Sequence, residues 1–143
     1  MLFRSLWFGN EHAAQEENPV YGTAQVLIGL AALPAHIDTS AIREKAIAFL
    51  RKNQNADGGW GGAKDAPSTL EETALATEAL AADPASTDAT ARGADWLAAA
   101  IGKGGLDSPS PIGLYFARLW YFERLYPIIF ATSALGRVLS KRG

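Results

Sequence analysis

The feature that most constrains this chain is a glycine turn between a helical pattern and a tryptophan, in residues 49–61. The turn reads Asn55-Ala56-Asp57-Gly58-Gly59 and lies between Gln54 and Trp60. Glycine allows a tight turn at positive φ, and the end of a helix leaves backbone carbonyl groups unpaired. Gln54 offers both a donor and an acceptor to such groups, and Trp60 can fold back over the joint. We interpret Gln54 and Trp60 as a structural staple.

A weaker copy of this design follows about one helical hairpin later. Residues 31–41 align with residues 81–91, residues 45–50 align with residues 92–97, and Gly58-Gly59-Trp60 aligns with Gly104-Gly105-Leu106. Each unit consists of a helix, a proline-containing turn, a second helix and a glycine turn, and the period is near 46–50 residues. Such a period is typical of stacked helical hairpins or of a closed toroid of hairpins.

The spacing of apolar residues predicts six helices and no strands. The predicted helices cover about residues 20–33, 41–54, 69–82, 87–100, 111–126 and 127–139. Pro34 should end the first of them, and Ser68 with Glu71 should form a capping box at the start of the third. We therefore expect an all-α fold of helical hairpins that forms part of an α/α barrel, with residues 1–143 as one domain.

Composition and charge exclude several classes of protein. The chain has 143 residues, of which 48% are hydrophobic, so it can bury a core. It has no cysteine and only two histidines, so we expect neither a disulfide framework nor a zinc cluster. The net charge is −2 and the sequence has no run of basic residues, and both observations argue against nucleic acid as a partner. The longest apolar runs are too short to span a bilayer, so we expect a cytoplasmic protein, without a metal or cofactor.

The turn and its surroundings resemble one protein family. The stretch Phe49-Leu50-x-x-x-Gln54-x-x-Asp57-Gly58-Gly59-Trp60-Gly61 resembles the QW repeat of the triterpene cyclases, notably the squalene–hopene cyclases. Three further segments are similar to segments of that family in the same order: Trp7-Phe8-Gly9 with Tyr21-Gly22-Thr23, residues 67–74, and Leu125-Tyr126-Pro127 with residues 134–137. A lone QW motif would also fit prenyltransferase β subunits, but the zinc-ligand set of that family does not occur here.

The resemblance implies an α/α barrel around a cavity in which a folded polyprene such as squalene is cyclised. In that family an Asp-x-Asp-Asp motif protonates a terminal double bond, and aromatic faces stabilise the migrating cation. This sequence contains no Asp-x-Asp-Asp. It therefore looks like the C-terminal part of a cyclase, and we expect no catalytic residue in it and no activity by itself. The resemblance also implies peripheral (monotopic) membrane contact for the full-length enzyme.

Three aromatic residues match cavity positions of the family. Tyr21 matches the tyrosine of the Tyr-Gly-Thr segment, which helps to order the acid side of the cavity. Tyr115 and Phe122 match aromatics of the C-terminal segment, although Pro111 and Leu119 depart from the pattern there. Seven of the 14 aromatic residues lie between Tyr115 and Phe130. Helical spacing alone favours a core role for this group, whereas the resemblance favours a cavity for Tyr115.

Several alternatives remain open at this point. The position of Glu71 and Glu72 at a helix start favours capping over acid–base chemistry, and Asp57 in a glycine turn favours turn geometry. The chain could instead be a non-catalytic helical-repeat module that binds an apolar ligand or a protein; an upstream reading frame encoding Asp-x-Asp-Asp would favour the cyclase. Three hairpins make up half of a six-hairpin barrel and leave apolar faces exposed, so we expect a homodimer or a higher homo-oligomer.

Overall fold

The computed structural model describes residues 8–115 and 119–141, and the side chains of that range except residue 14 and residues 112–119. The helices in these ranges are α1 (Pro19–Ala31), α2 (Ser40–Lys52), α3 (Leu70–Leu80), α4 (Thr87–Gly102) and α5 (Tyr126–Ser140). Short 3-10 turns lie at η1 (Ala14–Glu16), η2 (Pro84–Ser86) and η3 (Gly105–Asp107), and a hairpin is formed by β1 (Pro111–Tyr115) and β2 (Leu119–Phe122).

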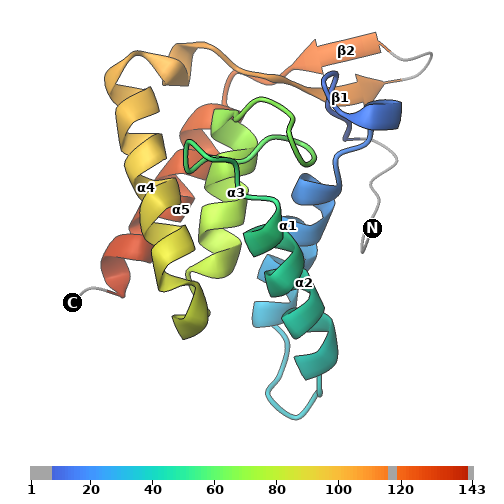
Figure 1. Cartoon of the computed structure of the whole chain (residues 1–143), viewed down its shortest axis with the longest axis vertical. Helices are drawn as coiled ribbons and strands as arrows, with labels where there is room; N and C mark the ends of the chain where they lie inside the picture. The colour runs from blue at the N-terminus through green and yellow to red at the C-terminus, as the bar shows by residue number, and fades with distance from the viewer. Residues whose placement is uncertain (1–7, 116–118, 142–143) are drawn as a thin grey trace.

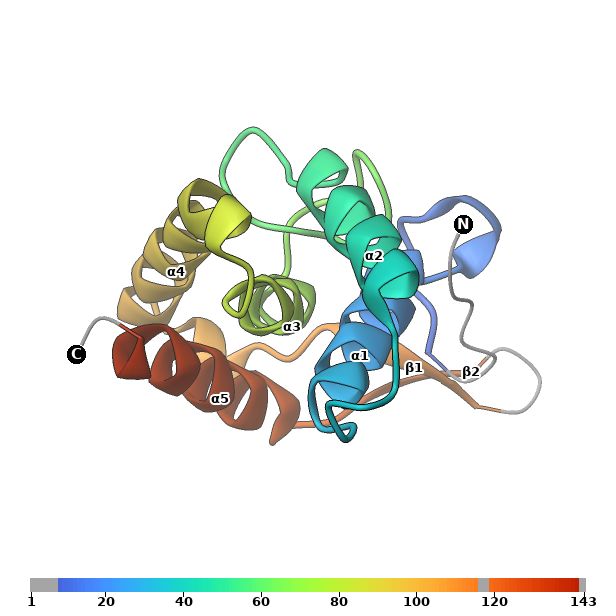
Figure 2. The ribbon, with the colours of Figure 1, turned by 90° about the horizontal axis from the view of Figure 1, so that it is seen from below.

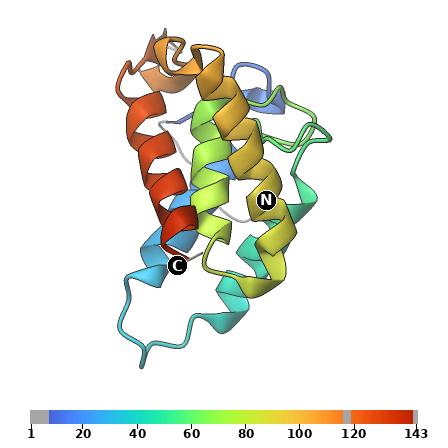
Figure 3. The same ribbon diagram turned by 90° about the vertical axis from the view of Figure 1, so that its left-hand side faces the viewer.

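Helix α3 lies at the centre of the fold. The other four helices surround it (Figure 2), and α4, α3 and α5 run side by side (Figure 3). Every residue of α3 except Glu78 is buried, as is typical of a helix covered on all sides. One core cluster lies between α1, α2 and α3, and a second lies between α3, α4 and α5. Helix α3 therefore contributes to both core clusters and joins them.

Two helix starts are fixed by side chains that cap the first turn. The side-chain oxygen of Asn18 accepts a hydrogen bond of 3.0 Å from the backbone nitrogen of Tyr21, and Pro19 follows at the start of α1. The N-cap of α3 is Thr69, whose hydroxyl accepts from the backbone nitrogen of Glu72 at 3.3 Å. The predicted capping box at Ser68 and Glu71 was therefore wrong by one residue.

Ser68 is not available as a cap because it belongs to the preceding turn. Its hydroxyl donates to the carboxylate of Asp57 at 2.9 Å and accepts from the side-chain amide of Asn55 at 3.0 Å. The backbone nitrogen of Thr69 donates to the carbonyl oxygen of Trp60 at 3.0 Å, which closes this turn. Thr69 is therefore the N-cap, and α3 begins at the next residue, Leu70.

The predicted helix over residues 111–126 was wrong, because residues 111–122 form an antiparallel hairpin. Gly113 pairs with Tyr121, Leu114 with Trp120 and Tyr115 with Leu119. Proline and glycine oppose a helix at the start of this segment, while aromatic residues favour strands. The hairpin lies across the end of the helical bundle at which α1 and α5 begin (Figure 1). The fold is thus mostly helical rather than all-α.

The remaining predicted helices were confirmed, with ends that differ by at most two residues. Predicted helices at 20–33, 41–54, 69–82 and 87–100 correspond to α1, α2, α3 and α4, and the prediction at 127–139 corresponds to α5. Among the described residues no helix has the length and apolarity needed to cross a membrane.

Candidate functional site

Aromatic side chains from four segments gather near the starts of α1 and α5. The rings of Phe8 and Tyr21 stack, with centroids 4.3 Å apart and an interplanar angle of 15°. Tyr126 and Phe130 lie one turn apart on α5, with centroids 4.9 Å apart. Phe8, Tyr126 and Phe130 all pack on the core cluster that contains Tyr21. We refer to these four residues and Tyr121 of β2, which interacts electrostatically with both tyrosines, as the aromatic cluster.

Tyr21 is the most buried member of the aromatic cluster, with 8% of its surface exposed. Burial raises the pKa of its phenol from 10.0 to about 12, against the effect of a hydrogen bond with Gln25. Electrostatic interactions with Tyr126, Tyr121 and Glu72 raise the pKa further. The phenol therefore stays neutral across the physiological pH range. A neutral ring can attract a cation through its face without presenting a phenolate nucleophile.

Tyr126 has a related environment at the start of α5. Burial raises the pKa of its phenol, and electrostatic interactions with Tyr121 and Glu123 add to this effect. The β2 strand alternates its side chains between two faces, so Tyr121 lies on the face opposite to Trp120 and Phe122. The ring of Trp120 lies close to Gly9, where an added Cβ would be 3.0 Å from it. The hairpin thus packs against the segment that carries Phe8.

The structure places the three predicted cavity residues differently. Tyr21 lies within the aromatic cluster. Phe122 is 59% exposed and lies outside it. The backbone of Tyr115 pairs with Leu119 at the end of the hairpin, but its side chain lies outside the described part of the chain.

Four members of the aromatic cluster were missed by the sequence reasoning: Phe8, Tyr121, Tyr126 and Phe130. The i, i+4 spacing of Tyr126 and Phe130 was a usable signal, because such residues meet on a helix face. The signal for Tyr121 was hidden by the helical interpretation of residues 111–126.

Two adjacent glutamates at the start of α3 are fully buried, with 0% exposure each. The Glu72 carboxylate accepts from the side-chain amides of Asn10 at 3.0 Å and Asn18 at 2.8 Å, and from the hydroxyl of Thr69. The predicted role in capping thus applies to Glu72, which pairs with the N-cap residue.

Glu71 does not cap the helix through its side chain. Its carboxylate accepts from the backbone nitrogen of Ser110 at 2.7 Å and from the hydroxyl of Ser110 at 2.8 Å. Burial raises the pKa of Glu71, the hydrogen bonds from Ser110 oppose this shift, and the charge of Glu72 adds to it. Glu71 therefore ties the start of α3 to the segment that leads into β1.

The Gln54–Trp60 turn contacts both α2 and α4. The side-chain amide of Gln54 donates to the carbonyl oxygens of Gly58 and Ala89, each at 2.9 Å. Trp60 is fully buried, and its indole nitrogen donates to the carbonyl oxygen of Leu50 at 2.8 Å. These contacts join the turn to the helix before it and to the next hairpin along the chain.

The Asp57 carboxylate lies in the same turn and accepts hydrogen bonds from its neighbours. Burial alone would raise its pKa, but hydrogen bonds from Gly59, Ser68 and Trp96 outweigh this effect and lower the pKa. The indole nitrogen of Trp96 donates to Asp57 at 2.9 Å, which brings a second contact from α4. An acid whose ionised form is stabilised in this way is poorly suited to donate a proton, in agreement with the predicted role in turn geometry.

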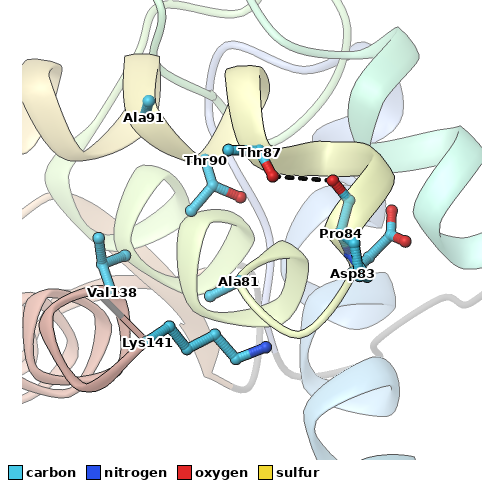
Figure 4. Close-up of a pocket in the computed structure, with 8 residues that line it drawn as sticks. All are labelled: Ala81, Asp83, Pro84, Thr87, Thr90, Ala91, Val138 and Lys141. Atoms are coloured by element: carbon cyan, nitrogen blue, oxygen red, sulfur yellow. Dashed lines mark hydrogen bonds between the residues drawn. The ribbon is translucent and has the colours of Figure 1, made fainter. Parts of the chain in front are cut away.

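Pockets lie at both ends of α5. The pocket at its start, of about 280 Å³, is lined by Leu106, Asp107, Pro109, Arg124, Leu125 and Ile128, none of which belongs to the aromatic cluster. A pocket of about 290 Å³ lies between η2, α4 and the end of α5 (Figure 4). It is lined by Ala81, Asp83, Pro84, Thr87, Thr90, Ala91, Val138 and Lys141. It lies at the opposite end of α5 from Tyr126 and so has no part in the aromatic cluster. No group of three or more His, Asp or Glu in the described part of the chain could hold a metal ion.

Comparison with known proteins points to one family. The family model described as squalene-hopene cyclase C-terminal domain matches residues 4–140. Squalene–hopene cyclase from Bradyrhizobium diazoefficiens is 36% identical over 129 residues, which cover 78% of this chain and 19% of that enzyme. A terpene cyclase–glycosyl transferase fusion protein from Humicola fuscoatra is 39% identical over 88 residues, which cover 54% of this chain and 7% of the fusion. The chain thus spans a fifth or less of the length of these relatives.

Proposed function

Because this chain belongs to the squalene-hopene cyclase C-terminal domain family, we propose that it supplies one aromatic wall of a cavity in which a polyprene such as squalene is cyclised. The observation that carries this proposal is the aromatic cluster around Tyr21. Its rings come from the segment before α1, from the starts of α1 and α5 and from β2, and so converge from separate parts of the sequence.

The chemistry of the aromatic cluster suits a carbocation. A cation close to an aromatic face gains electrostatic stabilisation, and preorganised groups in a water-poor site stabilise developing charge at little cost in reorganisation. The high pKa of Tyr21 keeps its phenol neutral, so the ring would not trap the cation as a phenolate would. The cavity roles predicted for Tyr115 and Phe122 remain proposals that are separate from the aromatic cluster.

We propose that the initiating acid comes from outside these 143 residues, since the sequence contains no Asp-x-Asp-Asp. The two buried acids, Glu71 and Glu72, and the exposed Asp57 serve other purposes. Glu71 and Glu72 hold Ser110, Asn10 and Asn18, and Asp57 is held in the turn. A polyprene mixed with this chain alone should therefore remain linear.

A chimera tests the proposal. The segment of the Bradyrhizobium squalene–hopene cyclase that aligns with this chain is replaced by this chain, and the products from squalene are analysed by gas chromatography and mass spectrometry. We expect cyclic triterpenes from the chimera and none from the isolated chain. A chimera with the thermal stability of the parent but without cyclic product would contradict the proposed wall, and cyclic product from the isolated chain would contradict the proposed external acid.

A variant of the chimera tests the aromatic cluster itself. Tyr21→Leu retains apolar volume and removes the ring, so we expect a larger share of products from early termination of the cyclisation. Leu139→Ala is the matched control, because Leu139 is 66% exposed at the far end of α5. An unchanged product pattern in the Tyr21 variant would remove Tyr21 from the wall.

A further inference from the structure

The buried carboxylates at the start of α3 each hold a segment that carries part of the aromatic cluster. Glu72 holds the segment before and at the start of α1, and Glu71 holds the segment before β1. We propose that Glu72 is a positioning residue for Tyr21, which it fixes through Asn18 against the ring of Phe8. The positioning of Tyr21 by Glu72 can be tested in the chain itself. Only its consequence for cyclisation rests on the proposed function.

Two hydrogen bonds connect Glu72 to the backbone of Tyr21. Asn18 donates from its side-chain amide to Glu72 at 2.8 Å and accepts from the backbone nitrogen of Tyr21 at 3.0 Å. Asn18 is 1% exposed, so water cannot readily replace either bond. The Asn18 side chain is thereby held at both ends, and the first turn of α1 is held with it.

A second connection runs from Glu72 toward Phe8. The side-chain amide of Asn10 donates to the same carboxylate oxygen at 3.0 Å, and Asn10 is 3% exposed. The amide of Asn18 also reaches the carbonyl oxygen of Gly9 at 3.3 Å. Gly9 directly follows Phe8 in the sequence. One carboxylate therefore holds both segments whose rings stack 4.3 Å apart.

Glu72 acts here as a hydrogen-bond acceptor. Its described partners are two amides and one hydroxyl, all of them neutral. A glutamine can present one carbonyl oxygen to both amides and donate its own amide hydrogens to the hydroxyl of Thr69. A methionine has nearly the same length but is a very weak acceptor, and it would leave two buried amide donors unpaired. The pair of variants therefore separates hydrogen bonding from volume.

Glu71 and Glu78 supply matched controls on the same helix. Glu71 is as buried as Glu72, but its partner is Ser110 in the segment that leads to β1. Glu78 is the partly exposed residue of α3. We expect Glu71→Met to disturb the hairpin side of the aromatic cluster and to leave the Phe8–Tyr21 stack intact, while Glu78→Met should leave both unchanged.

The test follows the ring of Tyr21 in the full chain. Ring-current shifts of the Phe8 and Tyr21 signals are measured by NMR, and the ionisation of tyrosine is followed by absorbance at high pH. In Glu72→Met we expect the shifts to be lost and Tyr21 to ionise at a lower pH, with helix content by circular dichroism unchanged. Glu72→Gln should restore the ring-current shifts, while Tyr21 should still ionise at a lower pH than in the parent because the charge of Glu72 is lost. A folded Glu72→Met variant with unchanged ring-current shifts would overturn the proposal, as would a Glu72→Gln variant in which these shifts are lost.

A second variant decides the question if Glu72→Met does not fold. Asn18→Asp retains the acceptor for the backbone of Tyr21 and removes the amide that donates to Glu72 and to the carbonyl oxygen of Gly9, while the bond from Asn10 to Glu72 remains. We expect the same displacement of the Tyr21 ring; native ring-current shifts in Asn18→Asp would overturn the proposal.

The chimera then shows whether this position matters for cyclisation. Small displacements of a positioned group lower rates strongly, so we expect Glu72→Met to reduce cyclic product roughly tenfold and Glu72→Gln to restore it. A displaced Tyr21 with unchanged cyclisation would contradict the proposed function of the wall and leave the positioning by Glu72 intact. A Tyr21 ring that keeps its position in Glu72→Met would contradict the positioning role of Glu72, whether or not cyclic product is formed.

Discussion

The indole nitrogen of Trp60 donates a hydrogen bond of 2.8 Å to the carbonyl oxygen of Leu50, so the glycine turn is closed back onto the helix it leaves. Both residues are fully buried in the same core cluster. The backbone nitrogen of Trp60 donates to the hydroxyl of Thr73 at 2.9 Å, which adds a contact to α3. One side chain and its own backbone thereby join the second and third helices.

Removal of this indole should cost much of the stability of the chain. We expect Trp60→Phe to lower the free energy of unfolding by about 1–3 kcal/mol, because the ring remains but the carbonyl of Leu50 loses a partner. Trp60→Ala should cost about 3–5 kcal/mol, since it also leaves a cavity. Urea unfolding followed by circular dichroism measures both. Equal losses for the two variants would show that the hydrogen bond, rather than the buried ring, dominates.

Gly93 sets how closely α4 approaches α3. A Cβ added at Gly93 would lie 2.3 Å from the hydroxyl oxygen of Thr77 and 2.8 Å from the ring of Trp60. We expect Gly93→Ala to destabilise the chain by about 1–3 kcal/mol, because the helices must move apart. Gly136→Ala is the matched control: it has open space around it within α5 and should stabilise by about 1 kcal/mol. A gain in both variants would contradict the close approach.

The sequence predicted the turn well and the aromatic hairpin poorly, for physical reasons that differ. The turn at Gln54 and Trp60 is specified by local chemistry: glycine conformations, a helix end and one large ring. Residues 111–122 carry aromatics at positions that fit a helix face and a strand alike, so their neighbours in space decided the outcome. The role of Glu71 could not be predicted, because its partner Ser110 lies 39 residues away.

Glu71 should make the stability of the chain depend on pH. Its pKa in the fold is raised above the ordinary value of 4.5 by burial, despite the hydrogen bonds from Ser110. The folded chain therefore holds this proton more tightly than the unfolded chain. The stabilisation from the bound proton is fully present below pH 4.5 and is lost as pH rises through the folded pKa. The charged group that faces it is Glu72, which acts in the same direction.

Glu71→Gln isolates this effect. Glutamine carries no charge and can still accept from the backbone of Ser110 and donate to its hydroxyl. We expect the variant to be more stable than the parent at neutral pH, with a difference that shrinks on acidification. The measurement is urea unfolding of both chains from about pH 4 to pH 8. A stability difference that does not change with pH would show that the native pKa of Glu71 is not raised.

Exposed apolar side chains at the start of α5 should cause self-association. Leu125 and Ile129 are 57% and 53% exposed, and Ile128 is 45% exposed. We expect the molar mass from light scattering to rise with concentration, and Ile129→Lys to lower it toward that of the monomer. Leu139→Lys, at the other end of α5, introduces the same charge as a control and should not lower the mass. A monomer at every concentration would contradict the predicted homo-oligomer.

Tyr21 provides the most direct test of the aromatic cluster. Because burial raises the pKa of its phenol from 10.0 to about 12, the difference in absorbance between the chain and its Tyr21→Phe variant should titrate near pH 12. Because the folded pKa is raised, the fold favours the neutral form of the phenol. Its contribution to stability is complete below pH 10 and is lost as pH rises toward 12.

Phe8→Ala should expose Tyr21 and lower the midpoint of the Tyr21 titration, because the ring stacked 4.3 Å away is removed. Phe122→Ala, which removes an exposed aromatic outside the cluster, should leave it unchanged. A midpoint near 10 in the parent chain would show that the Tyr21 phenol is solvated, and a solvated phenol could not form part of a dry wall for a carbocation.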